Sequence, residues 1–310
     1  MKNVRTSTAA GIAALALLLA ACGGQNGSTG GSVAIDGSST VAPLSEAAAD
    51  LYRDVDSAVN VTVATSGTGG GFEKFCAGET DISDASRPIK EEEAAICAEN
   101  GIEFTEIVIA NDGLSVVVSK ENTWAKCLTT EQLATIWSPE SEGTITSWNQ
   151  VDASFPDEPL ALFGAGTDSG TFDYFTEAIN GEEGAIRVDY SPSEDDNVIV
   201  QGVSGAKGGI GFFGLSYAEE NLDVLNLVQV DSGNGCVTPS TETVQDGSYT
   251  PLGRPLFIYV SNNSYMEKAF VKAFVDFYVE KALEVAELAL FVPLTDDQVS
   301  LAQEELASIS

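Results

Sequence analysis

An apolar run, a stretch of small polar residues and a helical apolar pattern follow one another in the middle of the chain. Leu160–Phe163 is apolar and predicts a buried strand, and Gly164–Thr171 contains only small or polar residues. After this stretch, Phe172, Phe175 and Ile179 recur at helical spacing. The pattern predicts a strand, a tight loop and the start of a helix in direct succession.

Two earlier segments show the same order of strand, polar loop and helix. A strand over Val33–Ile35 precedes the polar loop Asp36–Pro43, and the alternating strand Val59–Thr65 precedes Ser66–Gly71. The first N–H groups of a helix lack partners within the helix, and the helix dipole favours negative charge there. Each loop is therefore a candidate binding site for an anion.

Ser169, Gly170 and Thr171 lie at the predicted start of the central helix, where two hydroxyls and a glycine suit an anion. For this loop taken alone, the alternative is an ordinary N-cap formed by Asp168 or Ser169. Three such loops in one chain favour convergence on one anionic ligand over three independent turns.

A fourth candidate combines small polar residues with a positive charge. Arg87 follows Ser86 and precedes Pro88, which fits the first turn of a helix through Glu91–Cys97. The alternative is a surface arginine that pairs with one of the many acidic residues. Beside the three loops, we expect Arg87 to be a forked donor to an oxyanion.

The remaining pattern predicts further strands and capped helices. Strands are expected at Phe104–Ala110, Leu114–Ser119, Gly208–Tyr217, Leu225–Val230 and Leu256–Val260, with Asn111–Gly113 between the first two. Helix caps are expected at Thr129, Asp195, Ser264 and Thr295, and an apolar stripe of core residues from Phe270 to Tyr278. The alternation predicts an α/β protein with mainly parallel sheets covered by helices. Ligands in such sheets lie at the carboxyl ends of strands, where the polar loops fall.

Length and charge limit the classes of function. The chain has 310 residues, of which 44% are hydrophobic, enough for two lobes with a core each. Its formal net charge of −33 argues against a nucleic-acid-binding protein, which needs a basic surface. The absence of histidine excludes Ser-His-Asp and Cys-His catalysis and argues against a zinc enzyme. We expect no enzyme activity, no metal and no cofactor.

A basic start and a short apolar core mark residues 1–21 as an export signal rather than a membrane-spanning helix. The signal ends in L-A-A-C, which resembles a bacterial lipobox. This resemblance implies cleavage before Cys22 and a diacylglycerol on its sulfur. Cleavage would remove two basic residues and change the net charge from −33 to −35. Residues 22–32 would then tether the protein to the membrane.

Four cysteines remain in the exported part of the chain, Cys76, Cys97, Cys127 and Cys236. An even number in an exported protein indicates disulfides, and four cysteines allow three pairings. We favour Cys76–Cys97, which closes a local helical region, and Cys127–Cys236, which joins two distant parts of one lobe. Buried free thiols are the alternative.

From about Val33 to its end, the chain resembles the substrate-binding lipoproteins of bacterial phosphate ABC transporters. The motifs that carry the resemblance are GSSTVAP, SGTGGGFEKFCAGETDISDASRPI, GTDSGTFDYFTEAI, SEDDNVIVQGV and PLGRPLFIYV. The resemblance implies a two-lobed type II periplasmic-binding-protein (Venus flytrap) fold with the ligand cleft between the lobes. The predicted domains are residues 33–109 with 256–310 as lobe 1 and residues 110–255 as lobe 2.

The resemblance also implies which residues hold phosphate. Thr40 and Val41 match the first loop, which gives backbone N–H groups and a hydroxyl to phosphate. Asp84 matches an aspartate that accepts a proton from the bound phosphate. Many family members place an arginine shortly before S-G-T, whereas Gly164–Gly166 occupies those positions here, and Arg87 is expected to supply the charge. The predicted phosphate-binding set is Ser39, Thr40, Val41, Ser66, Asp84, Arg87, Ser169, Gly170 and Thr171.

We therefore expect an extracytoplasmic, lipid-anchored monomer that captures inorganic phosphate and delivers it to the permease subunits of an ABC transporter. A receptor for sulfate, molybdate or an organophosphate is one alternative. Ionised Asp84 can only accept a hydrogen bond, which argues against fully ionised sulfate. A phosphate sensor is a second alternative. The third is a phosphate-ester hydrolase with Ser169 as nucleophile, for which no histidine is present as a base.

Overall fold

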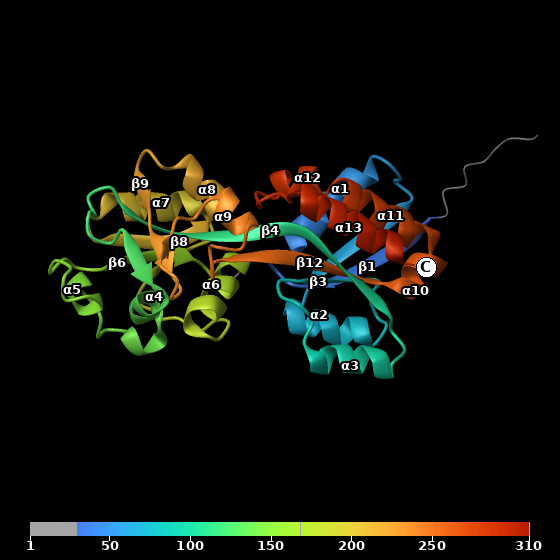
Figure 1. Cartoon of the computed structure of the whole chain (residues 1–310), viewed down its shortest axis with the longest axis horizontal. Helices are drawn as coiled ribbons and strands as arrows, with labels where there is room; N and C mark the ends of the chain where they lie inside the picture. Colours follow the sequence, from blue (N-terminus) through green and yellow to red (C-terminus); the bar gives the residue numbers. More distant parts are fainter. Residues whose placement is uncertain (1–29, 168, 310) are drawn as a thin grey trace, which may run out of the picture.

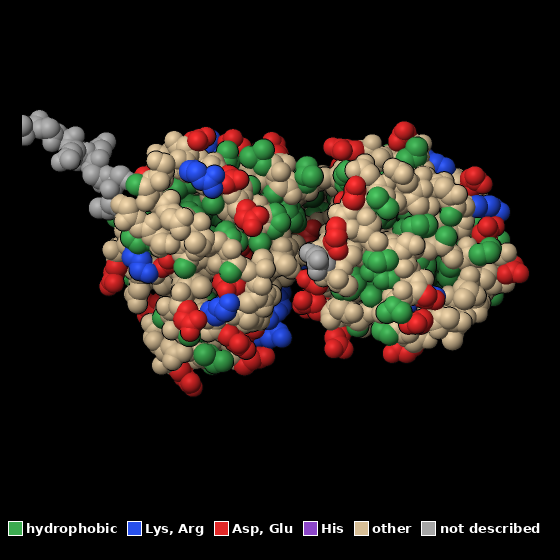
Figure 2. Space-filling view, turned by 180° about the vertical axis from the view of Figure 1, so that it is seen from behind, with side chains coloured by type: hydrophobic (Ala, Val, Ile, Leu, Met, Phe, Trp, Pro, Cys, Tyr) green, Lys and Arg blue, Asp and Glu red, His purple; other side chains and the backbone are tan. Residues whose placement is uncertain are grey.

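The computed structural model describes residues 30–167 and 169–309, and the chain forms two lobes joined by two long strands (Figure 1). The joining strands are β4 (Phe104–Ser119) and β12 (Gly253–Ser261). The space-filling surface narrows between the lobes (Figure 2). The predicted export signal, Cys22 and most of the tether lie outside the described residues, as does Asp168. The described residues include no helix that is long and apolar enough to cross a membrane.

Lobe 1 contains the first and the last of the described residues. Its first part comprises β1 (Gly31–Gly37), α1 (Ala42–Arg53), β2 (Val59–Thr65), α2 (Gly67–Cys76), β3 (Ile82–Ala85) and α3 (Glu91–Glu99). Its last part comprises α10 (Asn262–Glu267), α11 (Ala269–Glu280), α12 (Ala282–Leu288) and α13 (Asp296–Ser308). The helices α1, α11, α12 and α13 lie on one side of the sheet, and α2 and α3 lie on the other (Figure 1).

Lobe 2 holds the middle of the chain. It comprises β5 (Cys127–Thr129), α4 (Thr130–Trp137), a 3-10 turn (Pro139–Ser141), α5 (Trp148–Val151), β6 (Ala161–Ala165), α6 (Gly170–Asn180), β7 (Ser191–Ser193), α7 (Asp196–Gly205), β8 (Gly209–Gly214), α8 (Leu215–Glu220), β9 (Leu225–Leu227), β10 (Gln229–Asp231), β11 (Cys236–Val237) and α9 (Thr241–Gln245).

One sheet runs through both lobes in the order β2-β1-β3-β12-β4-β8-β6-β7, with β9 also paired to β4. The strands β2, β1 and β3 are parallel in lobe 1, and β7, β6 and β8 are parallel in lobe 2. The two joining strands are antiparallel to each other, because the chain leaves lobe 1 along β4 and returns along β12. The two-lobed α/β fold is confirmed, but the sheet is mixed rather than mainly parallel.

The predicted break at Asn111–Gly113 is wrong, because β4 continues through these residues. The Asn111 backbone exchanges hydrogen bonds with Val292, 2.8 and 3.0 Å long, and the pairing with β12 extends to Gly113 opposite Gly253. Pairing with β12, and with Val292 at Asn111, thus holds three residues that usually favour a turn in an extended strand. Leu114 begins the core of lobe 2, so the crossing falls inside one strand. The residue boundaries of the lobes stay a prediction.

Each lobe has its own hydrophobic core. In lobe 1, α11 buries Phe274, Val275 and Tyr278 against the sheet, so the predicted apolar stripe is core. In lobe 2, Phe175 stacks on Phe212, with ring centroids 3.8 Å apart. Aromatic pairs of this kind add about 0.5–1.5 kcal/mol to area burial. Each lobe is therefore stabilised by its own core, which holds in place the loops that face the other lobe.

Three of the four predicted helix caps are confirmed. The side chains of Thr129, Asp195 and Thr295 each accept a hydrogen bond from a backbone N–H in the first turn of α4, α7 and α13. The cap predicted at Ser264 is wrong, because Ser261 caps α10 and the helix begins at Asn262. Ser261 ends β12, so the strand passes directly into the helix.

The two favoured disulfides are present. Cys76 bonds to Cys97, which ties α2 to α3, and Cys127 bonds to Cys236, which ties β5 to β11 at the edge of lobe 2. The second disulfide spans 109 residues of sequence, and nearly all of lobe 2 lies within that loop. Disulfides of this kind fit an oxidising compartment outside the cytoplasm.

Candidate functional site

The loops that follow β1, β2 and β3 meet helix α6 of lobe 2 across a narrow cleft. This arrangement follows from the parallel strands, whose carboxyl ends all face the other lobe. The residues that line the cleft are Ser38, Ser39, Thr40, Gly67, Thr68, Ser86, Asp173, Tyr174, Glu177, Glu183 and Arg254. Hydroxyl groups from lobe 1 therefore face carboxylates, a tyrosine and an arginine.

The first loop touches the start of α6 directly. The Thr40 hydroxyl donates to the Gly170 carbonyl at 3.3 Å, and the Ser39 hydroxyl donates to Asp173 Oδ2 at 2.9 Å. A Cβ atom on Gly170 would lie 2.7 Å from the Thr40 Cα, so only glycine allows this approach. The structure thus brings the predicted residues Ser39, Thr40 and Gly170 together. About 10 Å³ of space remains in the cleft, close to the smallest volume that holds one water.

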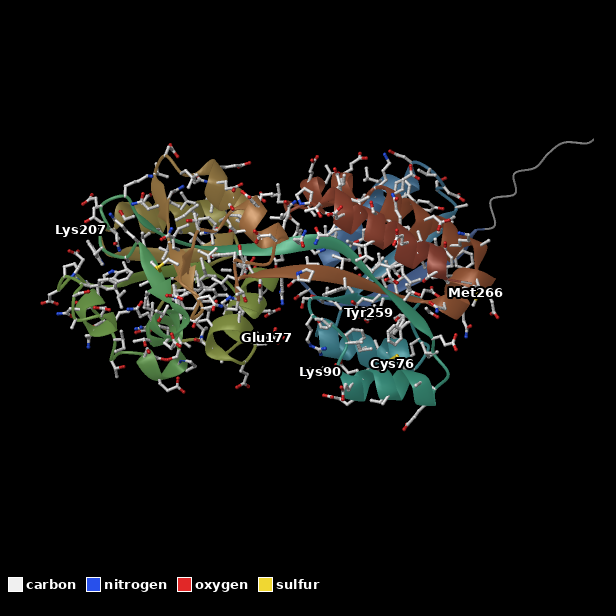
Figure 3. All side chains as sticks on the ribbon, in the orientation of Figure 1. Cys76, Lys90, Glu177, Lys207, Tyr259 and Met266 are labelled. Atoms are coloured by element: carbon white, nitrogen blue, oxygen red, sulfur yellow. A yellow bond between two sulfur atoms is a disulfide. The ribbon has the colours of Figure 1, made fainter. Side chains whose placement is uncertain are left out.

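A wider pocket of about 340 Å³ continues from the cleft along the start of α2. It is lined by Ser66, Gly67, Thr68, Gly69, Gly70, Ser86, Arg87, Lys90, Glu177 and Glu183. Lys90 and Glu177 approach this gap from opposite lobes (Figure 3). The first N–H groups of the ten-residue helix α2 and two positive side chains make the lobe 1 wall attractive to an anion.

Helix α2 begins earlier than the sequence predicts, because the stretch Ser66–Gly71 is helical from Gly67 onward. A Cβ on Gly71 would lie 2.5 Å from the Gly37 Cα, so this glycine lets the helix pack closely on β1. The Ser66 hydroxyl and N–H both donate to Asp36 Oδ1, at 2.8 and 3.0 Å. Burial raises the pKa of Asp36, but hydrogen bonds from Lys74 and Ser66 outweigh it and hold that pKa below its usual value. Ser66 is thereby fixed at the rim of the wider pocket.

Arg87 lies beside the wider pocket, but Glu93 holds its guanidinium. Two parallel hydrogen bonds of 2.8 Å join Arg87 Nη1 and Nη2 to the Glu93 carboxylate. Glu93 also accepts from the Lys90 N–H at the start of α3. The hydrogen bond to Glu93 is the main cause that raises the pKa of Arg87 further. Arg87 is therefore placed at the pocket as predicted, although within an ion pair of the kind that the sequence left as the alternative.

The structure places Asp84 outside the cleft, contrary to the predicted contact with phosphate. Asp84 is fully buried on β3, and its side chain points to Ser45 of α1, whose hydroxyl donates to Oδ1 at 2.9 Å. Oδ2 is buried without a hydrogen-bond partner. The alternation of side chains along a strand explains the error, because Ala85 and Ser83 take the opposite face. Burial raises the pKa of Asp84 to about 8, with smaller contributions from Asp36 and Glu46.

Val41 is also in the core rather than at the cleft. Its backbone N–H donates to the Ser38 carbonyl at 3.2 Å, and the Thr40 N–H donates to the Ser38 hydroxyl. The loop thus uses these N–H groups internally, whereas the resemblance assigns them to phosphate.

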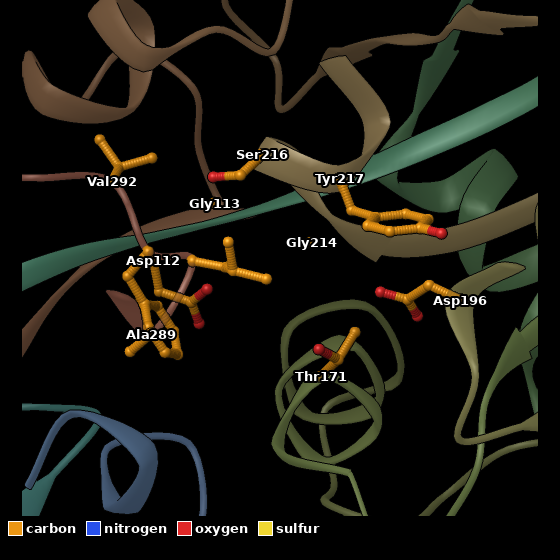
Figure 4. Close-up of a pocket in the computed structure, with 11 residues that line it drawn as sticks. Asp112, Gly113, Thr171, Asp196, Gly214, Ser216, Tyr217, Ala289 and Val292 are labelled. Atoms are coloured by element: carbon orange, nitrogen blue, oxygen red, sulfur yellow. The ribbon is translucent and has the colours of Figure 1, made fainter. Parts of the chain in front are cut away.

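Ser169 and Thr171 take separate roles at the start of α6. Ser169 is the N-cap, because its hydroxyl accepts from the Thr171 N–H at 3.2 Å, as in the ordinary cap considered as an alternative. Thr171 lines a second interlobe pocket of about 200 Å³, together with Asp112, Asp196 and Tyr217 (Figure 4). Among the described residues, two carboxylates and no basic side chain line this second pocket, so it suits an anion less than the cleft, whose lining includes Arg254.

Arg254 lines the cleft, although the sequence reasoning did not assign it to the site. It lies on β12 and reaches both lobes, since its Nη2 donates to the Thr40 hydroxyl and its guanidinium carbon lies 3.3 Å from the Tyr174 ring centroid. A signal was available in the sequence, because few basic residues exist and Arg254 lies just before the predicted strand Leu256–Val260.

Comparison with known proteins of similar sequence and structure identifies the family of this chain. Residues 24–282 match the PBP superfamily domain. The protein SphX of Synechococcus elongatus is 48% identical over 277 residues, which cover 89% of this chain and 81% of SphX. The phosphate-binding protein PstS of Staphylococcus saprophyticus is 39% identical over 298 residues, which cover 94% of this chain and 91% of PstS.

Two solved structures support the same conclusion. The crystal structure of a possible phosphate binding protein from Planctomyces limnophilus is 44% identical with a TM-score of 0.86, covering 90% of this chain and 98% of that one. PstS from Borrelia burgdorferi is 25% identical with a TM-score of 0.65, covering 85% and 99%. The chain therefore belongs to the PBP superfamily, in the family of SphX and the phosphate-binding protein PstS.

Proposed function

We propose that this protein captures inorganic phosphate between its lobes and delivers it to the permease of an ABC transporter. The observation that carries the proposal is the convergence of three hydroxyl-bearing loops of lobe 1 on the start of α6. The names of the relatives indicate which oxyanion is bound, since PstS proteins 38–39% identical to this chain are phosphate-binding proteins.

The groups at the cleft suit an oxyanion. The Ser86 hydroxyl and the N–H groups at the start of α2 are donors that border the ligand space. The hydroxyls of Ser39 and Thr40 become donors to the ligand when it displaces Asp173 and the Gly170 carbonyl. Arg87 lies in the adjoining wall, paired with Glu93. A micromolar affinity needs about 8 kcal/mol. A few hydrogen bonds to a charged ligand, worth about 1.5–3 kcal/mol each, supply that amount. Ser66 lines the wider pocket and Gly170 contacts Thr40 beside the cleft, and we assign both residues to the wall of the binding site.

The net charge of −33 does not prevent anion binding. Acidic side chains are spread over both lobes (Figure 2). Charges beyond about 8 Å are screened at physiological salt, whereas the donors act at contact distance.

Selection of phosphate over sulfate requires an acceptor at the cleft, because phosphate still carries a proton near neutral pH. Asp173 lies at the cleft and already accepts from Ser39. An ionised carboxylate can only accept, so it favours a protonated ligand and faces a fully ionised one with repulsion. We assign to Asp173 the role that the sequence had given to Asp84.

We propose a binding function without catalysis. Ser169, the candidate nucleophile, has its hydroxyl engaged as a helix cap, and the sequence has no histidine to activate it. Among the described residues, no group of three or more His, Cys, Asp or Glu is placed to hold a metal ion.

We also propose that the mature protein is a monomer held at the outer face of the cell membrane by a lipid on Cys22. Deleting the gene from its host should abolish phosphate uptake at micromolar concentration and leave sulfate uptake unchanged. The wild-type gene should restore uptake, and the Cys22→Ser protein should appear in the soluble fraction instead of the membrane fraction. Uptake that persists after deletion would contradict a transport role and favour a sensor.

A further inference from the structure

Arg254 is a positively charged residue of the cleft whose guanidinium has no role yet in binding the anion. It lies on β12, where the chain returns to lobe 1, and its side chain is 13% exposed. Its guanidinium touches the other joining strand through Asp112, lobe 1 through Thr40 and lobe 2 through Tyr174. Arg254 is thus a positive charge at the junction of both lobes and both joining strands.

The polar contacts of Arg254 are long. Its Nε lies 3.4 Å from Asp112 Oδ2, its Nη2 lies 3.3 Å from the Thr40 hydroxyl, and its Nη1 lies 4.0 Å from Glu177 Oε2. Hydrogen bonds between a guanidinium and a carboxylate are usually about 2.7–2.9 Å long. A guanidinium has five N–H donors, and these contacts use two of them within hydrogen-bond distance. Arg254 therefore retains donors for a stronger acceptor.

Arg87 differs in this respect. Both of its terminal nitrogens bond to Glu93 at 2.8 Å, in the fork-to-fork geometry that is strongest for arginine. An anion that binds Arg87 through these nitrogens must first displace Glu93. An anion that binds Arg254 displaces only long contacts.

Tyr174 holds the guanidinium plane toward the cleft. Its hydroxyl donates to the Pro251 carbonyl at 2.7 Å, which fixes the ring against the chain just before β12. The ring faces one side of the guanidinium, so the donors at its edge point along the cleft toward Thr40. The edge of an arginine is the part that matches the geometry of an oxyanion.

We infer that Arg254 is a direct ligand of the bound oxyanion and its principal positive partner. This inference rests on the proposed function, and it deepens that function by naming the residue that links anion binding to the joining strands. An anion on Arg254 also contacts the Thr40 loop of lobe 1 and the start of α6 in lobe 2. About 10 Å³ is free at this point, so the bound anion takes the place of the direct contacts of Thr40 and Ser39 with α6 and joins the lobes in their stead.

Titration calorimetry of purified variants with phosphate tests the inference. We expect Arg254→Gln to weaken binding by about 100-fold and Arg254→Lys by about tenfold, since lysine keeps the charge and loses the fork. Arg87→Gln should weaken binding less than Arg254→Gln. Arg53→Gln, which alters an exposed arginine far from the cleft, should have no effect. Arg254→Gln affinity within threefold of wild type would overturn the inference.

A second variant separates contact with the anion from a role in holding the joining strands. Asp112→Asn removes the carboxylate that pairs with Arg254 and keeps the shape of the side chain. If Arg254 only holds the strands together, Asp112→Asn should weaken phosphate binding as much as Arg254→Gln, and that result would overturn the inference. If Arg254 contacts the anion, Asp112→Asn should bind phosphate at least as tightly as wild type, because the guanidinium loses a competitor. If Arg254→Gln fails to fold, the phosphate affinities of Arg254→Lys and Asp112→Asn can be compared instead, and the same two outcomes apply.

The test also separates this inference from the proposed function. Wild type that binds phosphate while Arg254→Gln binds it equally well would overturn the inference and leave the function standing. Wild type that ignores phosphate and binds sulfate or molybdate in an Arg254-dependent way would overturn the function and support the inference. Wild type that binds none of these anions would overturn both.

Discussion

Replacing Asp84 by Asn is expected to stabilise the protein at neutral pH by up to about 4 kcal/mol, less the constant cost of burying the asparagine amide. Asp84 is fully buried, its Oδ2 has no hydrogen-bond partner, and burial raises the pKa of its carboxyl to about 8. The folded protein must therefore keep a proton on Asp84 that the unfolded chain releases. Asparagine has nearly the shape of the protonated acid and keeps an oxygen that can accept from Ser45.

The sign of the pH dependence follows from the raised pKa. Below about pH 4, both states hold the proton, so the pH-dependent part of the difference between the wild type and Asp84→Asn should vanish. The buried amide of asparagine leaves a constant cost of about 1–3 kcal/mol, because no partner faces Oδ2. Between about pH 4 and about pH 8, the unfolded state binds fewer protons, so the wild type loses about 1.4 kcal/mol per pH unit at this site. Asparagine has no such dependence, so the gap between the two proteins should shift in favour of Asp84→Asn until about pH 8.

Urea unfolding of both proteins at several pH values measures this gap. A gap that is the same at about pH 4 and at about pH 7.5 would show that Asp84 is ionised in the folded protein. The same variant should leave the preference for phosphate over sulfate unchanged, because the Asp84 side chain faces α1 rather than the cleft. Entry of sulfate into the Asp84→Asn site would contradict the placement of this residue.

Removing the Cys127–Cys236 disulfide is expected to destabilise the protein by about 4–5 kcal/mol. The bond closes a loop of 109 residues, and chain entropy gives about 4.7 kcal/mol for a loop of roughly 100. Cys236 is exposed and Cys127 is half-buried, so replacing both by alanine removes little packing. The loss should therefore come from the bond itself and appear as a lower urea midpoint.

A reductant provides the matched control. Without it, the Cys127→Ala/Cys236→Ala double variant should unfold at lower urea than the wild type. With it, both proteins should unfold at the same urea concentration, because the wild type has then lost the same bond. A difference that persists in reductant would assign the effect to packing of the cysteine side chains.

The sequence predicts the fold well because the periodicity and the caps of most helices and strands are visible within short stretches of the chain. Alternating residues over Val59–Thr65 and the caps at Thr129 and Thr295 each specify one element, and the structure reproduces them. The main error in the fold is Asn111–Gly113, where local turn preference is overridden by partners from β12 and from Val292, both distant in the sequence. Such partners cannot be identified from local pattern.

The cleft is predicted only in part, because its geometry depends on which face of a strand each side chain takes. Ser39, Thr40 and Gly170 come together as the local pattern predicts, since the first two follow the end of β1 and Gly170 begins the helix after β6. Asp84 is one residue before the end of β3, still within the strand, and pleating turns it into the core. Arg254 comes from the far end of the chain, and only the pairing of β12 with β4 brings it to the cleft.

Titration calorimetry with phosphate and then with sulfate, after removal of any bound ligand, tests whether this protein is a selective phosphate receptor. We predict saturable heat at one phosphate per protein with a dissociation constant of about 1 μM or below, and no heat from sulfate. Sulfate that binds as tightly as phosphate would contradict the assignment of Asp173 as the selective acceptor. No heat from phosphate would contradict the claim that this protein is a phosphate receptor.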